Sequence, residues 1–137
     1  PDVVTGEILD ARELVTGKVG AVIFMQTTCG MCKKELRVFE EFSQAHGDKL
    51  VVVAISVDSG APGRVVGFRK GNGFPFTFLH DPQFETPGLF GLFFTPGLVL
   101  VGPDGNIEKI KSGFRADDKK SLNDTITRLT SKVIVEK

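Results

Sequence analysis

The only two cysteines of this 137-residue chain stand two residues apart, in the sequence CGMC over residues 29–32. A hydrophobic run over residues 20–25 and a polar bend over residues 26–28 precede them, and an amphipathic stretch follows over residues 33–42. This order predicts that Cys29 stands at the N-terminus of a helix. Backbone N–H groups and the helix dipole stabilise a thiolate there, so we expect Cys29 to be a nucleophile near neutral pH.

Cys32 lies one helical turn beyond Cys29, where its sulfur can attack a mixed disulfide formed at Cys29. The two intervening residues close a small ring that forms and opens by thiol–disulfide exchange. The pattern therefore predicts a redox switch.

Three other interpretations of the pair compete with this one. A zinc site would need further ligands, but no second cysteine pair exists, and His46 and His80 do not follow the usual ligand spacing. A purely structural disulfide is disfavoured because so short a loop removes little chain entropy from the unfolded state. Two inert buried thiols would not need to stand at a helix start.

Length and composition fit one globular domain over residues 1–137, with 41% hydrophobic residues. The 17 basic and 17 acidic residues cancel, and Tyr and Trp are absent, which argues against a nucleic-acid interface. We expect the twelve phenylalanines in the core. No apolar stretch approaches the ~20 residues of a membrane span, and residues 1–4 show no signal pattern. Because the first residue is Pro, a removed signal or anchor stays open.

Hydrophobic patterning predicts two buried strands, residues 21–25 and 50–57, joined by the helix that carries Cys32 and ends near residues 46–48. The second run is apolar throughout, which predicts a central strand covered by helices on both sides and parallel to the first strand. Before them, Ile8 to Val15 is expected to be irregular or a short strand and turn.

After these strands, the sequence predicts a helix that starts at Pro62, runs through Arg69 and is stopped by the GNG sequence at residues 71–73. A short strand over residues 76–79 and a short broken helix within residues 85–92 are expected next. Two strands, residues 97–101 and 107–111, flank a PDGN turn and predict a hairpin, and a helix over residues 116–132 follows. The expected fold is α/β, a central mixed sheet flanked by helices, with an extra helix inserted after the second core strand.

A CxxC beside such a βαβ unit is typical of a thioredoxin-like redox site. The chain resembles the thioredoxin superfamily, and within it the TlpA/ResA/CcmG-like thiol-disulfide oxidoreductases, by pattern over nearly its whole length. The matching pieces are GKV before the first strand, TCGMCKKEL around the cysteines, SVD at a strand end, the extra helix, FPF, TP before a strand, and the DG turn.

The resemblance implies a thioredoxin-like fold in which Cys29 is the attacking thiol and Cys32 the resolving thiol. It implies that Pro96 is a cis-proline beside the disulfide, with the Thr95 backbone available to pair with an incoming peptide. Glu35, three residues after Cys32, could accept or relay the proton of its thiol, or could be a solvated helix charge.

Three features depart from the family pattern. Thr28 stands where the family usually has Trp, so the apolar lid beside the reactive sulfur is missing. Ile23 occupies the strand position of a buried acid in thioredoxins, which raises the importance of Glu35. Gly30 and Met31 lack the usual proline, so reductant, oxidant and isomerase remain possible, with reductant favoured by the resemblance.

The leading hypothesis is a protein-disulfide oxidoreductase that needs no bound cofactor and no metal, is recycled by a membrane or soluble electron donor, and works as a monomer. The resemblance implies an extracytoplasmic bacterial setting, periplasmic or membrane-anchored, and substrates such as apocytochrome thiols; a cytoplasmic setting is the alternative. Rival functions are a peroxiredoxin, whose P-x-x-x-T-x-x-C motif is absent, a Cu(I)-binding protein using both thiolates and His80, and a pure binding module.

Overall fold

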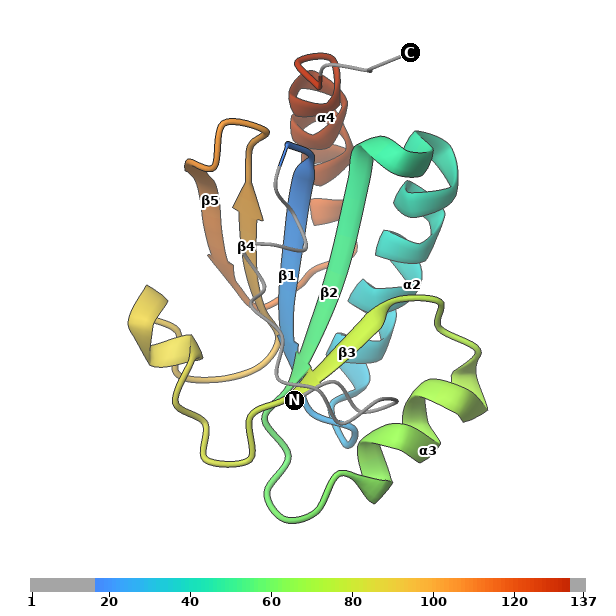
Figure 1. Cartoon of the computed structure of the whole chain (residues 1–137), viewed down its shortest axis with the longest axis vertical. Coiled ribbons are helices and arrows are strands. Elements are labelled where there is room, and N and C mark those ends of the chain that lie inside the picture. The colour runs from blue at the N-terminus through green and yellow to red at the C-terminus, as the bar shows by residue number, and fades with distance from the viewer. Residues whose placement is uncertain (1–16, 134–137) are drawn as a thin grey trace.

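The computed structural model describes residues 17–133, so the expectation for Ile8 to Val15 lies outside the described residues. Five strands form one sheet in the order β3-β2-β1-β4-β5 (Figure 1). The predicted mixed α/β architecture is confirmed, because β1 pairs with β2 in parallel and with β4 antiparallel. Along residues 17–133, no helix is long and apolar enough to cross a membrane.

The parallel part of the sheet is a β-α-β-α-β succession. Strand β1 spans Val19–Met25, helix α2 spans Gly30–His46, and the 3-10 turn η1 (Gly47–Lys49) leads into β2 over Leu50–Ser56. Strand β3 (Thr77–His80) then pairs with β2 in parallel. The carboxyl ends of all three strands consequently meet at one edge of the sheet, where the turn containing Cys29 begins.

The predicted extra helix is α3, Gly63–Asn72, between β2 and β3. Pro62 is its N-cap residue, where a fixed φ suits the helix start. Gly73 ends it in the left-handed conformation, with φ of 68°, and donates its N–H to the carbonyls of Arg69 and Lys70. This ending is the usual role of a glycine just past a helix.

The second half of the chain completes the sheet. The short broken helix predicted within residues 85–92 is the 3-10 helix η2, Pro87–Phe90. The predicted hairpin is β4 (Gly97–Val101) and β5 (Ile107–Ser112), antiparallel with an irregularity between Leu100 and Val101. Helix α4 (Asp118–Thr130) follows and packs against α2 and β1.

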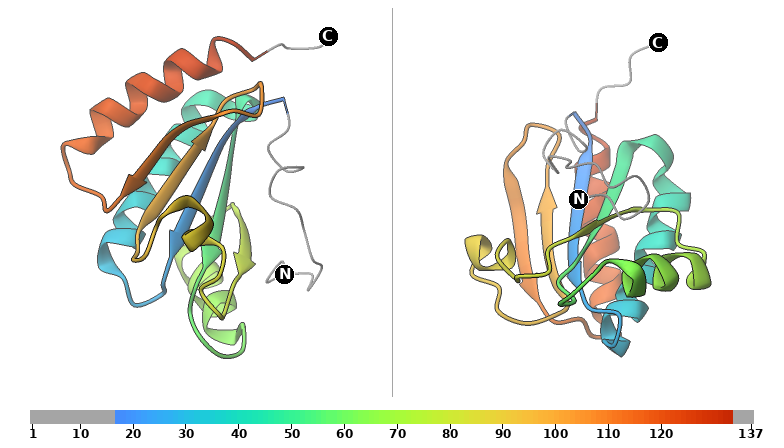
Figure 2. Two further views of the ribbon diagram at one scale, coloured as in Figure 1. Left: turned by 90° about the vertical axis from the view of Figure 1, so that its left-hand side faces the viewer. Right: turned by 60° about the horizontal axis from the view of Figure 1, so that its bottom comes forward.

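Alternation along the strands divides the core into two apolar clusters. On one face, the side chains of Ala21, Ile23 and Met25 join those of α2, α3 and α4, and α2 and α4 lie together on that side in the left view of Figure 2. On the other face, Val22 and Phe24 pack with strand residues and with Leu92 and Phe90. Within residues 17–133, all three α-helices pack on the first face, and residues of η2 and its flank pack on the second. The expectation that α-helices cover β2 on both sides is therefore not met in this part of the chain.

One core expectation is wrong. Ten of the twelve phenylalanines are buried or half-buried, but Phe93 and Phe94 are exposed. Both lie in the connection between η2 and β4, so neither belongs to a strand or helix face that the sheet could cover.

Candidate functional site

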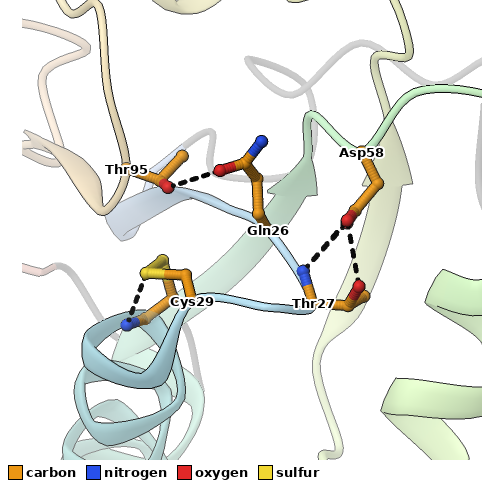
Figure 3. Close-up of a disulfide and its surroundings, with 6 residues drawn as sticks. Gln26, Thr27, Cys29, Asp58 and Thr95 are labelled. Atoms are coloured by element: carbon orange, nitrogen blue, oxygen red, sulfur yellow. Dashed lines mark hydrogen bonds between the residues drawn. A yellow bond between two sulfur atoms is a disulfide. The ribbon is translucent and has the colours of Figure 1, made fainter.

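The two cysteines form a disulfide at the start of α2 (Figure 3). Cys29 is the N-cap residue, with extended backbone, and its Sγ accepts a hydrogen bond from the backbone N–H of Cys32 at 3.1 Å. The sequence-based placement of Cys29 at the helix N-terminus is therefore confirmed. In the reduced state this N–H and the helix dipole would favour a thiolate on Cys29.

Exposure distinguishes the two sulfur-bearing residues. Cys29 is half-buried, whereas Cys32 has 0% exposed surface and belongs to the core cluster beneath α2. A partner disulfide can thus approach Cys29, whereas Cys32 is buried and is not accessible to a partner. This asymmetry fits one attacking and one resolving cysteine.

The turn before Cys29 is held by Asp58, a residue that sequence reasoning did not single out as part of the site. Its carboxylate accepts hydrogen bonds from the backbone N–H of Thr27, at 3.0 and 3.2 Å, and from the Thr27 hydroxyl at 2.9 Å. The Ser56 hydroxyl also donates to this carboxylate. Asp58 is only 7% exposed, so the end of β2 fixes the turn at the end of β1 through a buried carboxylate.

A signal for Asp58 was present in the sequence. It follows a buried strand by two residues, and the carboxyl ends of adjacent parallel strands must meet. An acid in that place was therefore a candidate partner for the backbone N–H groups of the neighbouring turn.

Thr95 and Pro96 lie beside the same turn. Their peptide bond is cis, as the resemblance implied, and Pro96 is buried. The register of β1 with β4 pairs Phe24 with Gly97, so the residues just before β4 lie alongside those just after β1. The Thr95 hydroxyl accordingly donates to the Gln26 side-chain oxygen at 3.1 Å (Figure 3).

Glu35 is fully buried on the inner side of α2. Its side chain is 0% exposed and neither carboxylate oxygen has a hydrogen-bond partner among the described residues. Burial raises the pKa of Glu35 to about 8, with Lys111 opposing and Asp118 adding to the shift. A solvated helix charge does not fit this environment. A carboxyl group that titrates near neutral pH, one turn beyond Cys32, can exchange protons in the range where thiols do.

The family departures have visible consequences. Thr28 is exposed, so no bulky lid covers Cys29 at that position. Ile23 is buried in the cluster between sheet and α2, the side on which thioredoxins would carry their acid. Lys33 and Lys34 are exposed on α2.

The two histidines lie in different elements. His80, at the end of β3, is buried, and its Nε2 lies 2.8 Å from the Asp58 carbonyl oxygen. His46 is the last residue of α2, at the opposite end from the cysteines. Among residues 17–133, no three His, Cys, Asp or Glu side chains gather as a metal-binding group.

Comparisons with known proteins agree with this geometry. A model of the AhpC/TSA family matches residues 3–110. No curated protein matches the chain.

Several solved structures are similar to the whole fold. A Chlorobium tepidum protein, provisionally assigned as the thiol:disulfide interchange protein DsbE, is 27% identical, with a TM-score of 0.74 over 84% of this chain and 82% of that one. StoA from Bacillus subtilis is also 27% identical, with a TM-score of 0.65 over 80% and 82%. A thiol-disulfide isomerase from Corynebacterium glutamicum is 21% identical, with a TM-score of 0.78 over 94% and 90%, which shows the fold.

Proposed function

The chain belongs to the AhpC/TSA family, within the thioredoxin superfamily, and on that premise we propose that it reduces disulfides in proteins through Cys29 and Cys32. The observation that carries this proposal is the cysteine pair itself. One sulfur caps a helix at the surface and the other lies in the core, joined in a disulfide.

The exchange proceeds in two displacement steps. The Cys29 thiolate attacks one sulfur of a substrate disulfide, which forms a mixed disulfide and releases the first substrate thiolate. The Cys32 thiolate then attacks Cys29 Sγ, releases the second substrate thiolate and leaves the Cys29–Cys32 disulfide. The two electrons that reduce the substrate come from this pair, and each released thiolate takes up a proton.

Cys32 is buried, so its thiol needs a nearby base before it can attack. We assign this role to Glu35, because burial raises the pKa of its carboxyl group to about 8, close to the pKa of an ordinary thiol, so a proton can pass between the two groups. In this proposal Glu35 accepts the Cys32 proton as the second step begins and returns it when the pair is reduced again.

Thr95 and Pro96 lie beside the turn that leads into α2. An extended substrate segment lying along Thr95 would bring its own disulfide beside Cys29, in the manner of a strand added to a sheet edge. We assign Thr95 and Pro96 to substrate positioning on this ground.

Neither rival enzyme nor metal hypothesis is favoured. The peroxidase motif P-x-x-x-T-x-x-C is absent before both cysteines, and the pair is closed within one helical turn. For Cu(I), the candidate third ligand is His80 at the end of β3. Its Nε2 lies 2.8 Å from the Asp58 carbonyl oxygen, so this nitrogen already has a hydrogen-bond partner.

The setting of the reaction is part of the proposal. Recycling requires a dithiol protein, soluble or membrane-bound, that reduces the Cys29–Cys32 disulfide. We place the protein in an extracytoplasmic compartment, acting as a single-domain monomer on protein substrates such as apocytochrome thiols, because the resemblance of its sequence pattern implies that setting.

Equilibration of the pair in a glutathione or dithiothreitol redox series tests the proposed direction. A reductant is expected to have a reduction potential near about −270 mV, the level of thioredoxin, whereas about −120 mV would indicate an oxidant. The Cys32→Ser variant, which cannot close the ring, is the control. Absence of a reversible Cys29–Cys32 disulfide in the wild-type protein would overturn the proposal.

A further inference from the structure

Phe93 and Phe94 are exposed although the other ten phenylalanines are not. Their side chains are 74% and 64% exposed, and they directly precede Thr95. Exposed neighbouring aromatic rings are unusual on a soluble surface, where they indicate an interaction site. The position of this pair, beside the residues assigned to substrate positioning, suggests what it contacts.

Exposed apolar side chains also occur in the CGMC turn and on η2. Met31, inside the CGMC turn, is 39% exposed, and Leu89 on η2 is 80% exposed. We call Met31, Leu89, Phe93 and Phe94 the apolar rim. The link between its two parts is short, because Thr95 is hydrogen-bonded to Gln26, whose carbonyl oxygen accepts the backbone N–H of Cys29.

The segment that carries Phe93 and Phe94 has no charged side chain. The chain carries no Asp, Glu, Lys or Arg from Thr86 to Gly97. A charged partner would therefore gain no ion pair from this segment, whereas an apolar partner would cover exposed rings.

We propose that the apolar rim selects substrate segments whose disulfide cysteine is flanked by aliphatic or aromatic side chains. Such segments are buried in folded proteins, so the substrates are polypeptides that have not completed folding. This inference rests on the proposed function, because a disulfide that reaches Cys29 must bring its neighbouring residues over the rim. That requirement favours a substrate segment over a second copy of this chain.

The test uses two peptides, each with one central cysteine held as a mixed disulfide with glutathione. Leucine, valine and phenylalanine flank the cysteine in one peptide, and serine and aspartate flank it in the other. Stopped-flow kinetics give the second-order rate constant of each peptide with the fully reduced protein. The apolar peptide is expected to cover part of the Phe93 and Phe94 rings, so its rate constant should exceed that of the polar peptide by about tenfold or more.

The decisive variant is Phe93→Ser combined with Phe94→Ser, which is expected to bring the ratio of the two rate constants close to one. Leucine at both positions should restore most of the preference, which separates apolar contact from a local structural effect. Ile107→Ser with Ile110→Ser is the matched control. These side chains are 49% and 45% exposed on β5, and their loss should leave the ratio as it is in the wild type.

The outcomes separate this inference from the proposed function. Equal rate constants for both peptides with the wild-type protein, or an unchanged ratio in the serine variant, would overturn the inference. Self-association of the wild-type protein that the serine variant abolishes would also overturn it, in favour of a second copy on the rim. If glutathione disulfide itself fails to oxidise the reduced wild-type pair, the proposed function fails instead.

Discussion

At the residue scale, the site combines a surface sulfur with a buried acid. Cys29 gains its reactivity from the backbone, because the N–H of Cys32 points at its sulfur. The raised pKa of Glu35 comes from the core, since a carboxylate without hydrogen-bond partners is costly in an apolar environment. In the proposed exchange, the first effect would act on the attack by Cys29 and the second on the resolution by Cys32.

Glu35 should make stability fall as pH rises. Its pKa is about 8 in the folded protein and near 4.5 when the chain is unfolded, so between these values the folded state binds the extra proton. The free energy of unfolding of the oxidised protein should drop by several kcal/mol from pH 5 to pH 8, at about 1.4 kcal/mol per pKa unit. Guanidinium denaturation followed by circular dichroism measures it.

Glu35→Gln is the matched variant, because it keeps the shape of the side chain and removes its titration. Its stability should change much less over the same pH range. An equal pH dependence in the variant and the wild type would show that Glu35 is not the group responsible.

Lys111 should tune the same acid. It lies within Coulomb range of Glu35, lowers the pKa of that carboxyl group, and pairs with Asp118 at 2.7 Å. Lys111→Met should move the pH midpoint of the stability change upward. Lys119→Met is the control, because Lys119 pairs with Glu41 on the outer side of the helices. A downward shift in Lys111→Met would contradict this electrostatic account.

At the element scale, the end of β2 determines the shape of the redox turn. Asp58→Ala removes an acceptor from the backbone and hydroxyl of Thr27 and leaves that N–H without its partner. We expect a loss of roughly 2–3 kcal/mol in the free energy of unfolding, measured by chemical denaturation. The rate of Cys29 alkylation in the reduced protein should change as well.

Asp104→Ala is the control for Asp58→Ala. Asp104 also accepts two hydrogen bonds from one residue, Asn106, but in the exposed β4–β5 turn. It should leave Cys29 alkylation unchanged. If both variants alter alkylation equally, Asp58 does not act through the turn.

The end of α3 offers a second prediction at this scale. Gly73 has φ of 68°, which a side chain disfavours, whereas Gly67 lies inside α3 and a Cβ there would meet nothing within 4 Å. Gly73→Ala should destabilise the protein by about 1 kcal/mol, and Gly67→Ala should stabilise it by about 0.5–1 kcal/mol. Thermal denaturation measures both, and effects of the same sign would contradict the assignment of α3.

Much of this scale was predictable from the sequence because the signals are local. Apolar periodicity located α2, the PDGN turn located the β4–β5 hairpin, and Pro62 and Gly73 bracketed α3. The burial of Glu35 was also predictable, since Glu35 lies on the same face of α2 as the buried residues Cys32, Leu36 and Phe39. Its charge made a solvated position equally plausible.

Other features depend on contacts between distant segments. The hold of Asp58 on Thr27 spans 31 residues, and only the register of β1 with β2 brings them together. The exposure of Phe93 and Phe94 has no local signature, because their composition is that of a core segment. Where composition and placement disagree in this way, function is a common reason.

At the scale of the whole molecule, the five strands form one sheet. Strand β1 is its centre, flanked by β2 and β4, and both apolar clusters share it. We therefore expect the chain to unfold in one cooperative transition. Far-UV circular dichroism and hydrogen exchange should report the same free energy for β1 and β2. Two separate transitions would contradict the proposal of a single domain.

The central claim is that Cys29 attacks and Cys32 resolves. Mass spectrometry of the reduced single-cysteine variants after mixing with a peptide disulfide tests it most directly. The account predicts that Cys32→Ser accumulates a stable peptide adduct on Cys29 near neutral pH, and that Cys29→Ser forms little or none. An adduct that forms faster on Cys32 than on Cys29 would contradict it.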